Sequence, residues 1–238
     1  MVYLFRSSKI LFMVKLDFST PAIQDYLKTI FDLTEGHSVA STTALAARLG
    51  ITPASVTGML QHLASANTPL VAYEKYRGVS LTSAGELAAL DIIRRHRLIE
   101  TFLVKTLGYR WDEVHEEADR LEHVISEDLE ARIARALGDP ERDPHGEFIP
   151  TAALTMPTDK SIPLSDLRPN QKAVIRYIRD ADSALLRHLE SLGLIPGVNI
   201  KALDFSPFDK NLRLHVGRQV GDVTVGEGIT RQVFIEIL

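Results

Sequence analysis

The chain has 238 residues, of which 45% are hydrophobic and 24% are charged, as is usual for a soluble globular protein. It contains no cysteine, which excludes disulfides, iron–sulfur clusters, thiolate zinc sites and a cysteine nucleophile. The formal net charge of −4 argues mildly against nucleic-acid binding, because DNA-binding proteins are usually basic, so the placement of the charges matters more than their sum.

Residues 1–15 form an apolar N-terminal extension. Two cations, Arg6 and Lys9, interrupt the apolar run and no small-residue cleavage site follows it, which argues against a signal peptide. The run is also too short to cross a bilayer. We therefore expect a cytoplasmic protein without membrane association, and we regard Met13 as an alternative start that would make residues 1–12 a mis-assigned beginning.

Residues 16–82 predict a winged helix-turn-helix. Helical spacing, alternation and turn residues indicate three helices and a hairpin, at 20–33, 41–49, 52–66 and 70–81. Thr52 and Pro53 form a cap and first turn for the third helix, and Arg77-Gly78 turns the hairpin. This order of elements is that of a winged helix-turn-helix, although a three-helix packing unit without a DNA role would share it.

The third helix begins with small and hydroxylic residues, so nothing bulky blocks its approach to a DNA groove. The hairpin tip carries two cations that are well placed to bind phosphates. Both features favour DNA binding over a purely structural unit. The residues that we predict to contact DNA are Thr52, Pro53, Ser55, Thr57, Lys75 and Arg77.

The rest of the chain predicts further helices, a linker and a small β domain. Three more helices are expected at 82–107, 111–125 and 126–137. Prolines and polar residues then predict a linker, and short strands with glycine-rich turns predict a small barrel. The fold class is therefore mainly α with a small β domain. The expected domains are a winged helix-turn-helix at 16–82, a helical domain at 83–138, a linker at 139–162 and a β domain at 163–238.

The helix at 111–125 carries a stripe of metal-binding residue types. Its members, His115, Asp119, Glu122 and His123, follow one another at i, i+4, i+7 and i+8, so they share one helix face. Two imidazoles and two carboxylates repel one another on one face unless a cation or protons intervene. A divalent metal accepts both kinds of ligand and removes the conflict.

The preceding long helix offers a second pair, His96 and Glu100, at i and i+4. Such a pair is common on a helix surface, but beside a helix that carries the same ligand types it favours a metal site. A different class of protein is also open, because His115-Glu116-Glu117-Ala118-Asp119 resembles a zinc-protease helix. The fifth residue is Asp where that motif has His, so a metal-dependent hydrolase is kept only as the alternative function.

At this point the residues resemble a known family, the diphtheria toxin repressor family of metalloregulators, and its manganese-responsive branch in particular. The segment 164–238 also resembles the SH3-like third domain of that family, which is similar to iron-transport accessory (FeoA-like) domains. The stretches that carry the resemblance are Asp25–Ile30, Tyr73–Gly78, Leu81–Ser83, Arg95–Glu100, His115–Ser126 and Leu192–Gly197.

The resemblance implies two metal sites. The primary site would consist of Asp25, Asp119, Glu122 and His123. The ancillary site would consist of His96, Glu100 and His115, together with Asp182 from the third domain. Iron-responsive members of the family carry Met and Cys where this chain has Asp25 and Asp119.

The same resemblance implies a homodimer that binds double-stranded operator DNA and represses metal-uptake genes when metal is bound. Three carboxylates and one imidazole in the primary set suit a hard cation such as Mn(II), with Fe(II) as the alternative. We accordingly expect a transcription regulator and not an enzyme. The helical domain would serve for dimerisation as well as for metal binding.

Overall fold

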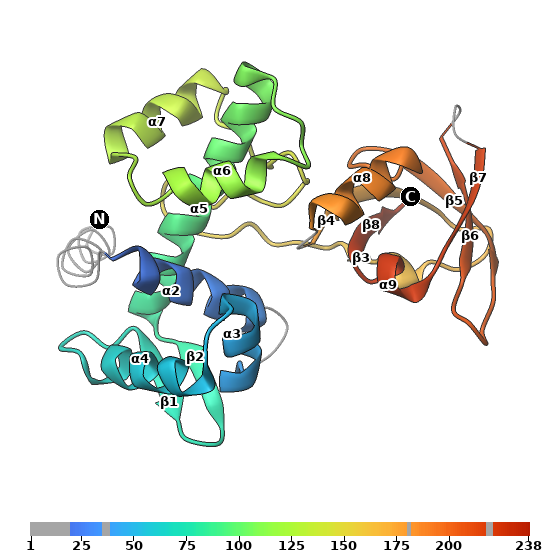
Figure 1. The fold of residues 1–238 in the computed structure, drawn as a ribbon. Helices are drawn as coiled ribbons and strands as arrows, with labels where there is room; N and C mark the ends of the chain where they lie inside the picture. The colour runs from blue at the N-terminus through green and yellow to red at the C-terminus, as the bar shows by residue number, and fades with distance from the viewer. Residues whose placement is uncertain (1–19, 35–38, 180–181, 218–220) are drawn as a thin grey trace. The chain divides into compact units, whose positions relative to one another are not determined.

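The computed structural model describes residues 20–34, 39–179, 182–217 and 221–238 (Figure 1). The N-terminal extension predicted at 1–15 lies outside the described residues. The chain divides into two compact units, each described here by itself. Unit 1 comprises Met1–Arg95 with Ala152–Thr155, and unit 2 comprises His96–Thr151 with Met156–Leu238. The long helix α5 (Ser83–Leu107) begins in the first unit and ends in the second.

Unit 1 is the predicted winged helix-turn-helix. Its elements before α5 are α2 (Pro21–Thr34), α3 (Thr42–Leu49), α4 (Pro53–Ser65), β1 (Val71–Glu74) and β2 (Gly78–Leu81). Local chemistry sets the helix ends, because Ser41 and Thr52 accept hydrogen bonds from the first turns of α3 and α4, and Gly50 ends α3 in the left-handed conformation. The predicted order of three helices and a hairpin is thereby confirmed.

The core of unit 1 is one apolar cluster that joins its helices to the wing. Side chains from all three helices are fully buried in it, among them Ile30, Leu45 and Leu60. Gly85, at the start of α5, packs closely against the backbone of Leu70, because a Cβ at this position would lie 1.9 Å from the Leu70 carbonyl oxygen. The wing therefore lies directly against the beginning of α5.

In unit 2, two short helices pack on the second half of α5. These are α6 (Val114–Leu121) and α7 (Glu127–Ala136), and each shares its own apolar cluster with α5. The sequence predicted a helix over 111–125, and this was wrong at both ends. Residues 111–113 form a turn before α6, and Val124 donates its amide to the carbonyl of Leu121 three residues back, so the helix tightens into a turn.

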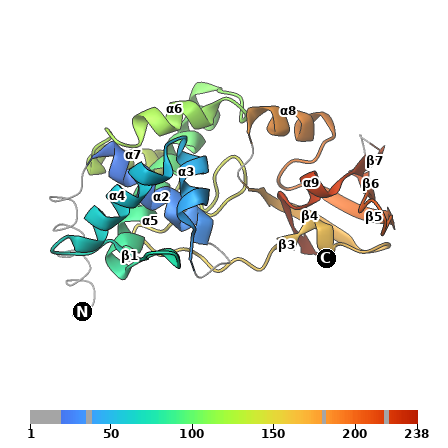
Figure 2. The same cartoon turned by 60° about the horizontal axis from the view of Figure 1, so that its bottom comes forward.

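The β domain consists of one antiparallel sheet with helices beside it. Among the described residues its strands are ordered β3-β8-β4-β5-β6-β7, with register shifts within β4 and β5 that help a small sheet to curve. Helix α8 packs on the sheet (Figure 2). The elements are β3 (Ile162–Pro163), η1 (Leu164–Asp166), β4 (Lys172–Ile178), α8 (Ser183–Ser191), β5 (Asn199–Phe205), β6 (Leu212–Val216), β7 (Gly221–Val225), α9 (Glu227–Thr230) and β8 (Val233–Ile237).

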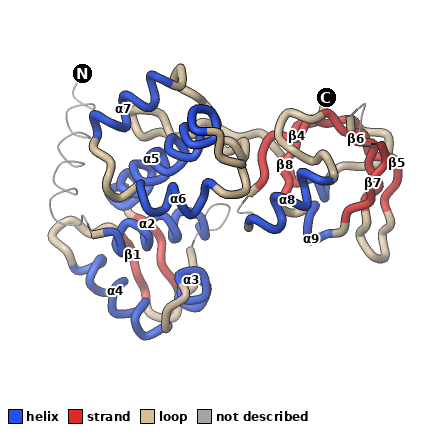
Figure 3. The backbone as a smooth tube through the Cα atoms, turned by 45° about the horizontal axis from the view of Figure 1, so that its top comes forward, coloured by secondary structure: helices blue, strands red, loops and turns tan. Residues whose placement is uncertain are grey.

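Figure 3 shows the predicted fold class directly: helices dominate the chain, and apart from the β1–β2 hairpin its strands gather in the C-terminal β domain. Residues 139–162, which we expected to be a linker, contain well-packed side chains. Asp143, His145 and Ile149 are buried, and Arg97 of α5 binds this segment through the carbonyl oxygen of Phe148 and the carboxylate of Glu147.

Candidate metal centre

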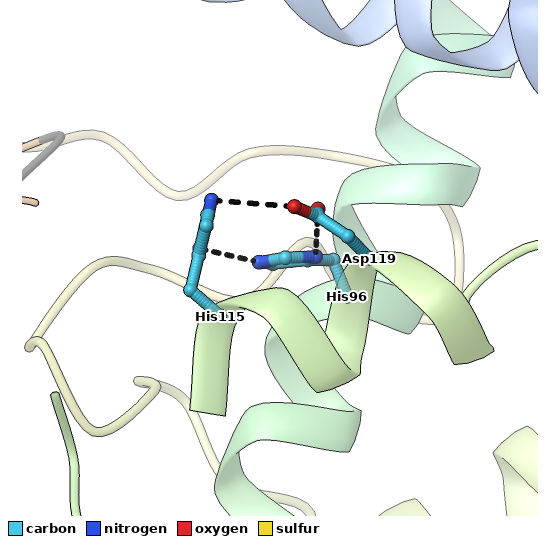
Figure 4. Close-up of side chains that lie close together, drawn as sticks. All are labelled: His96, His115 and Asp119. Atoms are coloured by element: carbon cyan, nitrogen blue, oxygen red, sulfur yellow. Dashed lines mark hydrogen bonds and ion pairs between the residues drawn. The ribbon is translucent and has the colours of Figure 1, made fainter. Parts of the chain in front are cut away.

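Three side chains from α5 and α6 form the first group of possible metal ligands (Figure 4). His96 Nε2 lies 3.1 Å from His115 Nδ1, and His96 Nδ1 lies 3.3 Å from a carboxylate oxygen of Asp119. The remaining pair, His115 Nε2 and Asp119, is 3.7 Å apart. The His96 side chain is buried whereas about half of each of the other two is exposed, so the group is open to solvent on one side.

Glu122 and His123 extend this group from the turn that follows α6. The Glu122 carboxylate is buried and pairs with Nδ1 of His96, on the same nitrogen that faces Asp119. Its other oxygen lies 3.7 Å from His123 Nε2. His96, predicted for the ancillary site, therefore adjoins two residues predicted for the primary site.

The two remaining predicted ligands belong to other helices, α2 and α8. Asp25 lies half-buried on α2, in unit 1. Asp182 is the exposed N-cap of α8, where its carboxylate accepts a hydrogen bond from the amide of Leu185 at 2.7 Å. Asp182 is absent from the donor groups found among the described residues.

A second donor group consists of Glu100, which was predicted as a ligand, with Asp143 and His145, which sequence analysis missed; all three are buried. Its Glu100 also lies 3.2 Å from Nδ1 of His115 and 3.1 Å from Nε2 of His96, so the two donor groups adjoin. One oxygen of Asp143 accepts hydrogen bonds from the amides of His145 and Glu147. The only sequence signal was the Asp-Pro-His spacing at 143–145, inside a segment interpreted as a linker.

The donor set of this second group fits a divalent cation. The Oδ2 atom of Asp143 is buried without a hydrogen-bond partner among the described residues, and the nearest cationic nitrogen, Arg97 Nε, is 3.6 Å away. Buried carboxylate oxygens normally have a partner, so an orphaned one marks a place for an ion or a proton. Two carboxylates and one imidazole are ligands that hard divalent metals accept.

Burial and mutual charge perturb all three groups. Burial, together with the charges of Glu100 and Glu147, raises the pKa of Asp143 to about 7. Burial alone would lower the pKa of His145, but its hydrogen bond to Glu100 and the negative charges of Glu100 and Asp143 raise that pKa to about 9. Burial opposes ionisation of Glu100, yet the charge of His96 and bonds from three histidines hold its pKa well below the usual range. Without metal, Asp143 and His145 therefore hold protons more tightly than they would in water.

His145 connects the second donor group to the β domain. Its Nε2 donates to the carbonyl oxygen of Trp111 at 2.8 Å, which leaves Nδ1 directed at Glu100, 3.7 Å away. Its own carbonyl oxygen accepts from the amide of Ile178 in β4. Trp111 stacks on the imidazole and packs against the core of the β domain. At Gly146, a Cβ would lie 2.1 Å from the carbonyl oxygen of Arg176.

The predicted DNA-contacting residues lie on the surface of α4 and at the wing tip. Thr52 Oγ1 accepts from the amide of Ser55 and bonds its hydroxyl at 2.9 Å, and Thr57 donates to the carbonyl of Pro53. In the wing, Lys75 lies over the ring of Tyr76, and the exposed Arg77 pairs with Glu74 at 3.2 Å. The exposed cations remain accessible to a large anionic partner.

Three family models match the chain in sequence. Residues 19–79 match the N-terminal DNA-binding domain of iron-dependent repressors, and residues 82–151 match their metal-binding and dimerisation domain. Residues 162–237 match the FeoA domain. The HTH-type transcriptional regulator MntR of Oceanobacillus iheyensis is 36% identical over 107 residues, which are 45% of this chain and 71% of that protein. The chain belongs to the diphtheria toxin repressor family of iron-dependent repressors.

Other members of the repressor family agree with this assignment. IdeR of Mycobacterium tuberculosis is 37% identical over 125 residues, so the match spans 52% of this chain and about half (54%) of that relative. A solved manganese-dependent transcriptional repressor in complex with manganese is 38% identical with a TM-score of 0.84, covering 90% of this chain and 99% of that one. The regulator ScaR with bound Zn2+ is 31% identical with a TM-score of 0.77, covering 90% and 99%.

These comparisons decide between the two predicted functions. The family consists of metal-dependent DNA-binding repressors, which agrees with the expected regulator and sets the hydrolase alternative aside. The predicted arrangement of a winged helix-turn-helix, a helical dimerisation domain and an SH3-like β domain is confirmed. In the part of the chain that the structure describes, no helix combines the length and apolarity needed to cross a bilayer.

Proposed function

We propose that this chain is a cytoplasmic repressor that binds operator DNA as a homodimer when Mn(II) is bound, with Fe(II) as the alternative effector. The choice of metal rests on the chemistry of the possible ligands. The donor atoms grouped with His96 are imidazole nitrogens and carboxylate oxygens, and the chain contains no cysteine. Oxygen-rich sites suit hard cations. A similar solved structure is a manganese-dependent transcriptional repressor in complex with manganese.

We assign the primary ligands to Asp25, Asp119, Glu122 and His123. Asp25 belongs to the DNA-binding unit and the other three to the unit that contains α6, so a shared coordination sphere would join the two units. Bound Mn(II) would supply positive charge that offsets the mutual repulsion of the three carboxylates. Asp25 would then hold α2 at a fixed angle to α6, and in a dimer this sets the spacing of two α4 helices against half-sites one DNA turn apart.

A second position would be held by Glu100, Asp143 and His145, next to His96 and His115. The buried, orphaned oxygen of Asp143 supports this extension of the predicted ancillary set. The predicted third-domain ligand, Asp182, would have to leave its capping bond to Leu185 before it could coordinate a metal. All of the second-position ligands except Asp182 lie between α5 and residue 145, so none of them belongs to the DNA-binding unit. Metal at this position would therefore adjust the Mn(II) concentration needed for DNA binding, and would not by itself cause DNA binding.

The test is metal-dependent DNA binding. Duplexes selected from a randomised library in Mn(II) would be labelled, and binding followed by fluorescence anisotropy with Mn(II) or with chelator. Asp25→Ala should abolish the effect of Mn(II), whereas His115→Ala should raise the Mn(II) concentration required yet reach the same binding at saturation. Asp182→Ala tests whether this capping aspartate contributes to the second position. Equal and complete loss in the first two variants would contradict this division of roles.

A further inference from the structure

The exposed face of α4 has only small side chains near the beginning of the helix. Val56, Leu60 and Leu63 are fully buried and fix the helix on the core of unit 1. The residues that face outward are small up to the middle of the helix and become long and polar only after it. The exposed residues of the helix through its third turn are Pro53, Ala54, Ser55, Gly58, Gln61 and His62.

The hydroxyl groups at the start of α4 are already used within the helix. Thr52 caps the helix through its bonds with Ser55, and the Thr57 hydroxyl donates to a main-chain carbonyl one turn back. Gln61 and His62 differ, because among the described residues no hydrogen bond or ion pair engages either side chain. They are the free hydrogen-bonding side chains on the outward face of this helix.

Gly58 lies one turn before both of them, in the helix interior. A Cβ at this position would meet no atom within 4 Å, and its backbone is helical, so neither packing nor conformation requires glycine. Glycine in a helix interior is unfavourable relative to alanine because of its backbone freedom. A local disadvantage that the fold does not explain is typical of a functional surface.

We propose that Gln61 is the base-reading residue of α4 and that the bare backbone at Gly58 lets it reach the floor of the major groove. A glutamine amide can donate to and accept from the N7 and N6 edge of adenine in the major groove, as a bidentate pair. Positions 58 and 61 are i and i+3, so they lie on one face of the helix. Because Gly58 has no side chain, α4 can enter the major groove more deeply next to Gln61.

This inference concerns which residues read the operator and rests on the DNA binding of the family. Thr52, Ser55 and Thr57, near the beginning of α4, were predicted to contact DNA, and this inference assigns the reading of bases to Gln61 further along the helix. The first turn then positions the helix against phosphates, which is the usual task of a capped helix N-terminus.

The experiment is selection of duplexes from a randomised library by the full-length protein in Mn(II), followed by affinity measurements on single-base variants of the selected site. Wild type should discriminate about 5- to 150-fold at one adenine position in each half-site. Gln61→Ala should lose this preference and keep the others. Arg77→Ala is the matched control, because a phosphate contact should weaken binding to every sequence equally.

Gly58→Ala supplies a second, independent readout. It should raise the melting temperature of the protein, since alanine favours the helix, yet weaken binding to the selected site at least several-fold. Circular dichroism and Mn(II) binding would verify that each variant is folded and loaded. Unchanged base preference in Gln61→Ala, or undiminished affinity in Gly58→Ala, would overturn the inference. Absence of any Mn(II)-dependent DNA binding by wild type would instead overturn the proposed function itself.

Discussion

The affinity of the buried group Glu100, Asp143 and His145 for Mn(II) should rise steeply with pH. Metal binds the unprotonated ligands, whereas the metal-free group has a pKa of about 7 at Asp143 and about 9 at His145. At pH 7 these values correspond to roughly one proton on His145 and half a proton on Asp143, and both must leave when the metal binds.

The size of the effect follows from the same two pKa values. Because both are raised, the protonated forms compete with metal below pH 9, so a rise in pH favours binding. Between pH 7 and pH 8 the affinity should increase about 17-fold, and between pH 8 and pH 9 only about sixfold, since Asp143 has by then lost its proton. About 1.5 protons should be released per metal at pH 7 and about one at pH 8.

Isothermal titration calorimetry measures both quantities, when Mn(II) is titrated in two buffers of different ionisation enthalpy at each pH. An Asp119→Ala background weakens the neighbouring donor group, so that the heat comes from the buried one. His145→Gln is the matched control, and in this variant proton release at pH 7 should fall by about one. An affinity that stays flat between pH 7 and pH 8, without proton release, would refute the protonated buried group and its assignment as a metal position.

Three further results are expected. Arg77→Ala should weaken binding to any DNA sequence and lower the slope of log affinity against log salt by about one, as measured by anisotropy from 50 to 200 mM salt. Gly85→Ala should lower the free energy of unfolding of unit 1 by about 1–3 kcal/mol, because the new Cβ meets the Leu70 carbonyl. Chemical denaturation measures this change, and an unchanged free energy of unfolding would show that the contact relaxes without cost. Mn(II) should activate DNA binding best, Fe(II) less and Zn(II) incompletely, and Asp25→Met with Asp119→Cys should favour Fe(II). An unchanged ranking in anaerobic assays would argue against this primary site.

The sequence predicted well those features that depend on neighbours along the chain. Ser41, Gly50 and Thr52 mark helix ends through bonds within four residues, so capping residues and apolar spacing were sufficient to place α3 and α4. The candidate metal ligands His96 and His115 were identified in the same way, because helical spacing aligns each of them with further possible ligands.

The features that were missed depend on contacts between distant segments. Asp143 and His145 are held by Arg97 and Trp111, more than thirty residues away, and no local periodicity reports such contacts. The helix predicted over 111–125 ends at Leu121. The prediction extended too far because the spacing of the residues still looks helical through the tightened turn that follows. An aspartate that begins a helix, as Asp182 does, suits both a cap and a ligand, so sequence alone does not distinguish the two roles.

Trp111 gives the protein a built-in optical reporter. It is the chain's single tryptophan, and its ring centroid lies 5.8 Å from that of His145, with the planes 30° apart. Indole emission responds to the charge and position of an adjacent imidazole, so filling of the buried donor group, to which His145 belongs, should change the signal. Metal binding to this group can therefore be followed in real time by stopped-flow fluorescence of the unlabelled, purified protein.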